Sequence, residues 1–440
     1  MRVAFLSLGC KVNYYETERM KEQFGERGHM VVSFEEAADA YIVNTCTVTN
    51  IADRKSRKML HRARRMNENA LVVAAGCYVD SARKRGEADG SVDFFIGNGE
   101  KDRLVEILEN ALREREGQSV QKKSEAAERE ERTRAYLKVQ DGCNQYCTYC
   151  IIPYVRGPLA SKPEDQVVAE VERLAGQGVQ EVVLTGIHLS SYGVDLTEKK
   201  SFLELEGKPL LSLVRAVGEV TGIRRIRLGS LEPRIITHAF AEELSGLEKA
   251  CPHFHLSLQS GCDDTLKRMN RHYSGREYLE KLEILRKYFL RPSITTDIIV
   301  GFPGETEEEF AATCAFAERA GFAKIHVFKY SRRQGTMADA MEGQVPEQVK
   351  AERSDRLIQI GRQLERAYGA PFLGQDAQVL LEEIALVQGK ECLVGYNERY
   401  MRVAIPVRER MQAEGLCNQV VPVRISGQGE DGIWLGEIAT

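Results

Sequence analysis

The strongest constraint on the fold is an alternation of short β-branched runs with helix-length amphipathic segments. In the first hundred residues, the candidate strands are 3–8, 40–43, 71–74 and 92–96. Strands separated by segments of helix length are typical of a parallel sheet with helices packed on its faces. The pattern therefore predicts an α/β fold that begins with a parallel sheet domain over residues 1–112.

The alternation stops between residues 113 and 134, where 13 of 22 positions are charged and Val120 is the only sizeable apolar side chain. Such a segment cannot bury a core of its own, so it predicts a charged linker or an exposed helix. The alternation then resumes, with strand-like runs at 135–139, 181–185, 224–228, 254–258, 295–300 and 324–330. Six strand and helix units predict a partial (β/α)6 barrel over residues 135–365.

The character of the chain changes again near Pro371. Short β runs follow at 378–382, 391–394, 400–405 and 419–425, separated by Gly, Asn and charged residues. This spacing is typical of antiparallel strands joined by turns. We therefore predict a small all-β barrel over residues 371–440.

Composition limits the class of protein. Lys and Arg number 61 and Asp and Glu 65, a formal net charge of −4, so a nucleic-acid partner would need a local basic surface. Eleven cysteines in 440 residues are too few for a disulfide-stapled secreted scaffold, and their number is odd. The cysteine content therefore favours reduced thiols or metal thiolates. No apolar run approaches the roughly 18 to 20 residues that cross a bilayer, and no cleavable leader is evident. We expect a cytoplasmic protein with no membrane partner.

Cys143, Cys147 and Cys150 form a C-x3-C-x2-C motif directly after the first predicted barrel strand. Three thiols within eight residues can form one disulfide with a spare thiol, a zinc site short of a ligand, or a [4Fe-4S] cluster that lacks one protein ligand. Zinc motifs usually pair C-x2-C with a second, distant pair, so the cluster is favoured. Its open iron could be chelated by S-adenosylmethionine, whose C–S bond an electron from the cluster can break.

A second set of cysteines is spread through the N-terminal domain. Cys10, Cys46 and Cys77 each follow a predicted strand, in the segments VAFLSLGC, YIVNTC and LVVAAGC. Because the carboxyl ends of parallel strands lie on one edge, where ligands normally bind, the three thiols should converge. In the alternative interpretation each is an ordinary buried cysteine. The functional interpretation is a second cluster that again leaves one iron free.

Several segments resemble known enzymes. Tyr149, directly before the last cysteine of the first motif, matches the signature of the radical S-adenosylmethionine (SAM) superfamily. The two cysteine triads, the segments LGCKVNYYETE, NTCTVTN and CIIPYVRG, and the C-terminal β-barrel resemble the methylthiotransferase family of radical SAM enzymes over essentially the whole chain. The GCKVN and NTCTVTN forms are similar to the branch that acts on threonylcarbamoyladenosine in tRNA.

This resemblance implies insertion of a methylthio group at C2 of N6-threonylcarbamoyladenosine beside the anticodon. It implies two [4Fe-4S] clusters: one held by Cys143, Cys147 and Cys150 that cleaves SAM, and one held by Cys10, Cys46 and Cys77 that carries the donated sulfur. A second SAM would methylate that sulfur, and an electron donor such as flavodoxin or ferredoxin would be needed. Three alternatives remain: a ribosomal-protein side chain as substrate, isopentenyladenosine in tRNA as substrate, and a non-catalytic RNA-binding redox sensor.

The resemblance also implies cofactor contacts at strand ends and glycine-rich turns of the barrel, although each residue could equally be an ordinary turn residue. The expected contacts are Tyr149, Thr185, Gly186, Gln259, Ser260, Gly301, Pro303 and Gly304. The histidines in or beside the predicted strands are interpreted as packed or hydrogen-bonded core residues: His188, His253, His255 and His326.

Two surfaces are candidates for RNA binding. Between residues 53 and 66 there are seven Lys or Arg and one acid, and helical spacing puts Arg54, Lys58, Arg62 and Arg65 on one face. The alternative is a solvated helix face. The C-terminal module resembles the TRAM domain, a small RNA-binding barrel, which implies stacking and phosphate contacts from Tyr396, Arg399, Tyr400 and Arg402.

Overall fold

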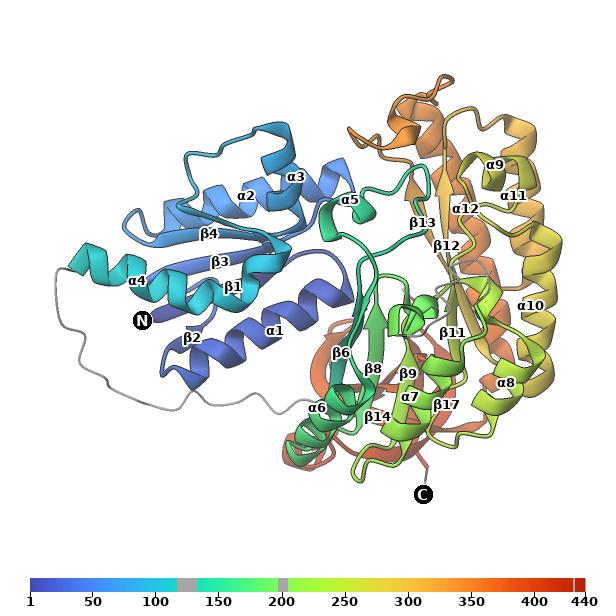
Figure 1. Cartoon of the computed structure of the whole chain (residues 1–440). Helices are drawn as coiled ribbons and strands as arrows, with labels where there is room; N and C mark the ends of the chain where they lie inside the picture. Colours follow the sequence, from blue (N-terminus) through green and yellow to red (C-terminus); the bar gives the residue numbers. More distant parts are fainter. Residues whose placement is uncertain (117–132, 197–204, 430–431, 440) are drawn as a thin grey trace. The chain divides into compact units, whose positions relative to one another are not determined.

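A five-stranded parallel sheet organises the N-terminal part of the chain (Figure 1). The computed structural model describes residues 1–116, 133–196, 205–429 and 432–439. The strand order is β2-β1-β3-β4-β5. The strands are β1 (Arg2–Ser7), β2 (Met30–Val32), β3 (Ala40–Thr45), β4 (Leu71–Gly76) and β5 (Phe94–Ile96).

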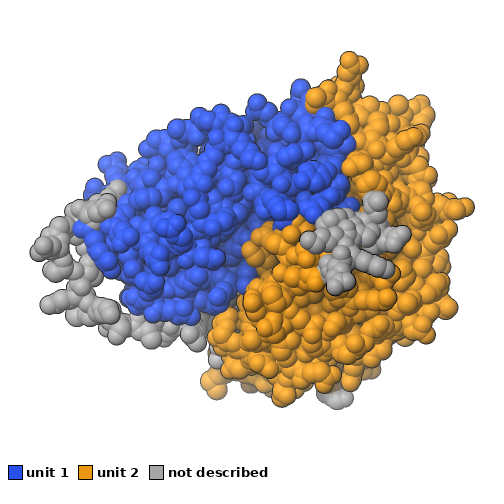
Figure 2. Space-filling view, viewed as in Figure 1, with its two compact units in different colours: residues 1–130, 142–158, 331–339 blue, residues 131–141, 159–330, 340–440 orange. Residues whose placement is uncertain are grey.

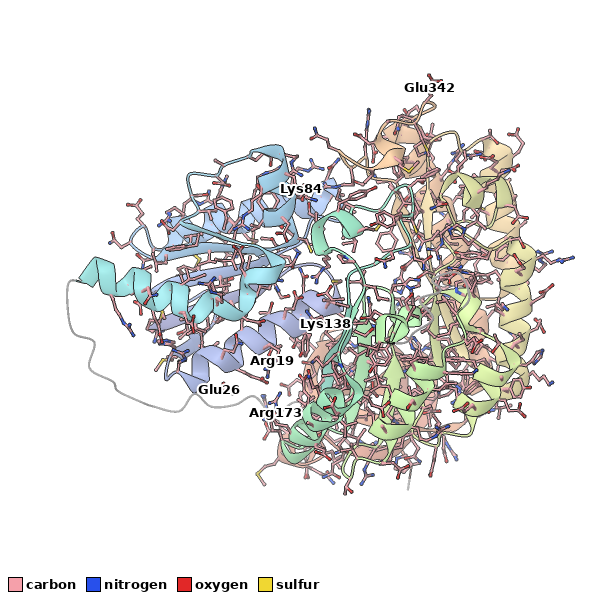
Figure 3. The ribbon with its side chains drawn as sticks, in the orientation of Figure 1. Arg19, Glu26, Lys84, Lys138, Arg173 and Glu342 are labelled. Carbon is pink, nitrogen blue, oxygen red and sulfur yellow. The ribbon has the colours of Figure 1, made fainter. Side chains whose placement is uncertain are left out.

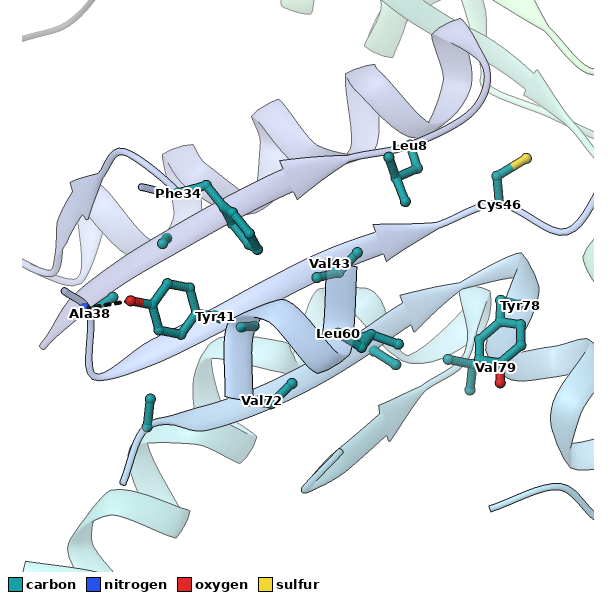
Figure 4. Packing of buried hydrophobic residues seen from close by; sticks show 14 of the residues in the cluster. Leu8, Phe34, Ala38, Tyr41, Val43, Cys46, Leu60, Val72, Tyr78 and Val79 are labelled. Carbon is teal, nitrogen blue, oxygen red and sulfur yellow. Dashed lines mark hydrogen bonds between the residues drawn. The ribbon is translucent and has the colours of Figure 1, made fainter. Parts of the chain in front are cut away.

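Helices cover both faces of this sheet because successive strand residues point to opposite sides. One face packs against α2 (Asn50–Met66) and α3 (Cys77–Arg85), as Figure 4 shows for Tyr41, Val43 and Leu60. The other face packs against α1 (Lys11–Glu26) and α4 (Leu104–Glu116). Both faces of β3 and β4 are buried, so these two strands form the centre of the domain.

The middle of the chain forms two four-stranded sheets, ordered β7-β6-β8-β9 and β10-β11-β12-β13. A bridge between Ile226 and Ala250 continues the parallel pairing from one sheet toward the other. The strands are β6 (Arg134–Asp141), β7 (Ala160–Ser161), β8 (Glu181–Gly186), β9 (Arg225–Leu228), β10 (Ser230–Leu231), β11 (His253–Leu256), β12 (Ser293–Val300) and β13 (Lys324–Lys329). The helices are α6 (Glu164–Gly176), α7 (Lys208–Gly218), α8 (His238–Ser245), α9 (Asp263–Arg268), α10 (Gly275–Tyr288), α11 (Glu307–Ala320) and α12 (Glu347–Gly369).

The C-terminal strands close into a barrel in the order β14-β15-β16-β18-β17. Closure gives every strand two neighbours, so no edge is left unpaired. Trp434, the only tryptophan of the chain, is buried in the barrel core. The strands are β14 (Asp376–Val387), β15 (Lys390–Asn397), β16 (Arg402–Pro406), β17 (Val420–Gln428) and β18 (Trp434–Ile438), with the short helix α13 (Arg410–Glu414).

The predicted fold class is confirmed: a parallel α/β sheet, a six-unit strand and helix array and a small β-barrel follow one another along the chain. Every predicted strand overlaps an observed one. Four strands were not predicted: β2, β7, β10 and β18. β2 adds a fifth strand to the first sheet, and β18 is the fifth strand that closes the barrel. β7 and β10 have two residues each and lie at the edges of the two central sheets. The segment predicted as a linker starts inside α4, which reaches Glu116, and ends where β6 begins. Residues 117–132 lie outside the described residues.

Contacts along the chain define two compact units, coloured in Figure 2. The first comprises residues 1–130, 142–158 and 331–339, and the second residues 131–141, 159–330 and 340–440. The loop with Cys143, Cys147 and Cys150 therefore groups with the N-terminal sheet, and the C-terminal barrel groups with the two central sheets. The division into domains 1–112, 135–365 and 371–440 stays a prediction. Among the described residues, no helix is both long and apolar enough to cross a membrane.

Candidate metal centres

Cys10, Cys46 and Cys77 lie at one edge of the N-terminal sheet. Cys10 is the N-cap of α1, Cys46 directly follows β3, and Cys77 is the first residue of α3 after β4. Strands β1, β3 and β4 are adjacent and parallel. The sheet order therefore brings together three cysteines that are more than thirty residues apart in sequence.

Gly9 allows the Cys10 loop to approach Cys46. Its φ of +101° is a backbone conformation that side-chain-bearing residues rarely adopt, and a Cβ at this position would lie 2.8 Å from the Sγ atom of Cys46. Any other residue would displace either the loop or the thiol. Close packing at this edge of the sheet therefore requires glycine at position 9.

Polar contacts surround the three thiols. Burial is the main cause that raises the pKa of Cys46 to about 11; Cys77 and Cys10 contribute in the same direction, and a backbone hydrogen bond and the charge of Arg156 oppose the shift. The Sγ atom of Cys77 accepts a hydrogen bond from Asn98 Nδ2 at 3.6 Å, and the Cys10 thiol lies 3.9 Å from Asn13 Oδ1. A metal bound at this edge would displace the thiol protons, because thiolates are the ligands.

Cys143, Cys147 and Cys150 lie in an irregular loop between β6 and helix α5 (Ile152–Arg156), and all three are half-buried. Backbone hydrogen bonds hold the loop: Cys143 N donates to Gly157 O at 3.2 Å, and Cys150 N donates to Cys147 O at 2.9 Å. Tyr149 is half-buried between the last two cysteines.

The ends of this loop are closely packed. At Gly142, with a φ of +65°, a Cβ would lie 1.9 Å from the carbonyl oxygen of Pro158. Lys84 of α3, labelled in Figure 3, donates to the carbonyl of Tyr154 in α5. The backbone of the loop is therefore fixed at both ends.

The residues present fit iron-sulfur clusters better than zinc. None of the eleven cysteines, all of which lie within the described residues, forms a disulfide. Each triad offers three cysteine ligands, one fewer than the four of a tetrahedral structural zinc site. A [4Fe-4S] cluster bound by three thiolates with one open iron matches this donor set.

Several other residues predicted to contact the cofactor are buried or already contact other residues of the protein. Thr185 is buried at the end of β8, and a Cβ at Gly186 would lie 2.6 Å from Gln140 Oε1. Gln259 has a positive φ of 71°. Ser260 is fully buried, and its Oγ atom lies 3.2 Å from Thr313 Oγ1. The hydroxyl of Ser260 thus has a partner inside the fold.

The space around the glycine-rich turn after β12 is also taken up by other residues of the protein. The amide of Gly301 donates to Glu305 Oε2 at 2.6 Å, and a Cβ at Gly301 would lie 2.3 Å from Cγ of Lys350. Pro303 is buried, and Gly304 N donates to Gly343 O at 2.8 Å. The glycines are required here for close packing against α12 and a neighbouring turn, and SAM contact at this turn stays a prediction.

The predicted basic face of α2 is present on the first unit. Arg54, Lys58 and Arg65 are exposed, and Arg62 is paired with Glu35. The N-cap of the helix is Thr49, whose side chain accepts a hydrogen bond from Ala52 N. Exposed positive side chains on one helix face are what phosphate binding requires.

The four predicted RNA contacts of the C-terminal barrel are half-buried. Tyr396 and Tyr400 stack on each other with ring centroids 4.8 Å apart, and the guanidinium of Arg134 lies 4.6 Å from the Tyr396 centroid. Arg399 donates to the carbonyls of Leu290 and Arg291, and Arg402 starts β16. The two tyrosine rings and the Arg399 guanidinium thus already contact other residues of the second unit. RNA binding by these residues stays a prediction.

Two groups of ionisable side chains were not predicted: one comprises Cys262, Asp264 and Glu309, and the other lies on three neighbouring strands. His255, Asp297 and His326 come from β11, β12 and β13, and their ligand-capable atoms lie within 4.8 Å of one another. His255 Nε2 is 3.2 Å from Asp297 Oδ2, and its Nδ1 is 3.0 Å from Thr295 Oγ1. Strand alternation alone would have placed residues 295 and 297 on the same face of β12. The parallel register then pairs Thr295 with His255 and Asp297 with His326.

Comparison with known proteins identifies the family. The threonylcarbamoyladenosine tRNA methylthiotransferase MtaB of Bacillus subtilis (strain 168) is 38% identical over 440 residues, which covers 97% of this chain and 94% of the relative. The chain belongs to the methylthiotransferase family of radical SAM enzymes. A tRNA-2-methylthio-N(6)-dimethylallyladenosine synthase of Methylacidiphilum infernorum (isolate V4), of another branch, is 33% identical over 95% of this chain and 91% of that relative.

Family models and solved structures agree with the fold of this methylthiotransferase. The model of the radical SAM superfamily matches residues 137–317, and that of uncharacterized protein family UPF0004 matches residues 2–97. The radical SAM methyltransferase TsrM from Kitasatospora setae, solved with cobalamin and a [4Fe-4S] cluster bound, superimposes with a TM-score of 0.52 at 15% identity. The match covers 77% of this chain and 73% of TsrM, and it shows similarity of fold.

Proposed function

We propose that this methylthiotransferase inserts a methylthio group at C2 of N6-threonylcarbamoyladenosine beside the anticodon of tRNA. The observation that carries the proposal is the presence, in one compact unit, of two triads of cysteines that form no disulfide. Family membership and the named activity of the B. subtilis relative support the choice of substrate.

Each triad would hold one [4Fe-4S] cluster. Cys143, Cys147 and Cys150 are assigned to the cluster that binds SAM, and Cys10, Cys46 and Cys77 to the cluster that carries the sulfur. When bound, the first cluster with SAM supplies a radical able to act on an unactivated aromatic C–H bond, and the second supplies the sulfur. The chain contributes the placement of the thiols: a loop pinned at Gly142 and Gly157 for one set, and adjacent strand ends for the other.

The basic face of α2 is assigned to the tRNA backbone. Arg54, Lys58 and Arg65 are exposed on a helix that starts four residues after Cys46. Phosphate contacts fix the position of an RNA without reading its sequence. Such contacts would hold the anticodon arm on the unit that carries the cysteines. The reaction also needs an electron donor such as flavodoxin or ferredoxin, and the substrate implies action in the cytoplasm.

Nucleoside analysis tests this function. A strain that lacks its own threonylcarbamoyladenosine methylthiotransferase is complemented with the wild-type chain, with Cys46→Ala, with Cys150→Ala, and with Cys417→Ala as a control outside both triads. We expect the 2-methylthio derivative of threonylcarbamoyladenosine in digested tRNA from the wild type and Cys417→Ala, and none from the other two.

The same cultures separate the alternatives. Appearance of 2-methylthio-isopentenyladenosine instead would assign the chain to the other tRNA branch, and a methylthiolated ribosomal protein would assign it to a protein substrate. A non-catalytic redox sensor predicts that the reduced, cluster-loaded protein releases no 5′-deoxyadenosine from SAM in the presence of tRNA. Unchanged tRNA in every strain contradicts the proposal.

A further inference from the structure

Arg156 is a buried cation in the segment that follows the cysteine loop. It is the last residue of α5, six positions after Cys150, and its side chain is only 1% exposed. A buried guanidinium needs charged or polar partners, because removal from water disfavours its charge. Its partners are in α1: Glu16 Oε1 at 3.0 Å and Asn13 Oδ1 at 2.6 Å.

Asn13 connects this cation to the loops that bear two of the strand-end cysteines. Its Nδ2 atom donates to Leu8 O at 2.7 Å and to Thr45 O at 2.8 Å, the carbonyls just before the Cys10 and Cys46 turns. The Cys10 thiol lies 3.9 Å from Asn13 Oδ1, the same oxygen that accepts the Arg156 hydrogen bond. The guanidinium therefore fixes the orientation of the amide that holds both turns.

Glu16 connects Arg156 to the third cysteine. Lys101, also buried, is paired with Glu16, and its Nζ lies 3.0 Å from Asn98 Oδ1. Asn98 Nδ2 in turn donates to Cys77 Sγ at 3.6 Å. One hydrogen-bonded network thus reaches all three strand-end cysteines from a single arginine.

Two cations and two carboxylates balance in this network. Arg156 and Lys101 both pair with Glu16, and Asp80 Oδ2 accepts a hydrogen bond from Asn98 Nδ2 at 2.7 Å. Removing Arg156 would therefore leave an excess of negative charge beside the cysteine turns. A buried positive charge near a thiolate-ligated cluster favours the state with the extra electron, since net charge and hydrogen bonds set reduction potentials.

We propose that Arg156 is a positioning residue for the strand-end site: it fixes Asn13 and Glu16 against the cysteine turns, and its charge raises the reduction potential of the cluster held there. The inference rests on the proposed function, since it requires a cluster at Cys10, Cys46 and Cys77. It also means that the segment carrying one set of ligands tunes the cluster held by the other.

The test uses the full chain with the loop triad removed. In a C143A/C147A/C150A background, only the strand-end cluster can assemble, and its midpoint potential is read by anaerobic redox titration with electron paramagnetic resonance. Arg156→Met and Arg156→Lys are compared with the unchanged background. The control is Arg2→Met, which removes a partly exposed cation that pairs with Glu36 at the opposite end of β1.

We expect about four irons per chain in the background, a midpoint potential that becomes more negative in Arg156→Met, substantial recovery in Arg156→Lys, and no change in Arg2→Met. Loss of iron in Arg156→Met that Arg156→Lys restores also supports the positioning role. An unchanged potential in Arg156→Met with its iron retained overturns the inference, as does loss of the folded circular dichroism spectrum in both Arg156 variants. Absence of iron from the background itself contradicts the proposed function instead.

Discussion

Replacing Glu181 by Gln should destabilise the second unit strongly. Glu181, at the start of β8, is 1% exposed, and three arginines converge on its carboxylate. Arg227 is closest, with Nε 2.9 Å from Oε1 and a side chain that is fully buried. Burial alone would raise the pKa of Glu181, but the charges of Arg227, Arg134 and Arg225 hold it below its usual value.

The same arginines join the central sheets to the C-terminal barrel. Arg225 donates to the carbonyls of Gln378 and Tyr396, and Arg227 donates to those of Asn397 and Glu398. The substitution leaves these buried cations without their shared carboxylate. Breaking a buried ion pair by removing one partner costs about 3 to 5 kcal/mol. We expect a loss of that size in the free energy of unfolding at neutral pH.

Urea unfolding followed by the fluorescence of Trp434 measures the effect, because this single tryptophan is buried in the barrel that the arginines contact. Asp376→Asn is the matched control: it breaks the exposed pair of Asp376 with Arg424, worth about 0 to 1 kcal/mol. If Glu181→Gln lowers stability by no more than this control, the buried network does not hold the barrel to the sheets, and the reasoning is refuted.

Three further predictions concern the cysteine loop, pH and RNA. Gly142→Ala should lower reconstituted iron from about eight to about four per chain with an unchanged circular dichroism spectrum, because its Cβ would meet the Pro158 carbonyl at 1.9 Å; full iron content would contradict this. Burial, with help from nearby arginines, lowers the pKa of His188 to about 3. The unfolded chain therefore binds an extra proton below about pH 6.5, and stability should fall on acidification by about 1.4 kcal/mol per pH unit, a dependence that His188→Asn should lack in urea titrations. Removing Arg54 and Lys58 together should flatten the slope of log affinity for an anticodon stem-loop against log salt by roughly 1.4 to 1.8, measured by fluorescence anisotropy; an unchanged slope would place the RNA elsewhere.

The sequence predicted the elements that depend on local pattern. Runs such as 40–43 and 71–74 are apolar and β-branched, so they identify the central strands, and the cysteines that end them follow the strands to one sheet edge. Parallel sheets have their loops at predictable ends, which is why three distant thiols could be placed together without coordinates.

Two of the strands that the sequence did not predict, β2 and β18, have weak local signals. β2 has only three residues, too few to show alternation, and it exists because β1 offers an unpaired edge. β18 contains Gly436, and it forms because the barrel needs a strand between β16 and β17. Both are products of tertiary pairing rather than of propensity.

The polar network around the cysteines could not be predicted for a different reason. Arg156, Glu16 and Lys101 come from three separate segments, and nothing in their spacing marks them as partners. The same holds for Tyr396 and Tyr400, which looked suited to stacking on RNA bases but stack on each other beside buried arginines. Long-range ion pairs and ring contacts depend on the packed fold, so only the structure shows them.

Iron quantification on anaerobically reconstituted protein tests the central claim most directly. The wild-type chain should hold about eight irons, C10A/C46A/C77A and C143A/C147A/C150A about four each, and the combined six-cysteine variant close to none. If either triad can be removed without loss of iron, the two sets of thiols do not hold separate clusters, and the account of this methylthiotransferase is contradicted.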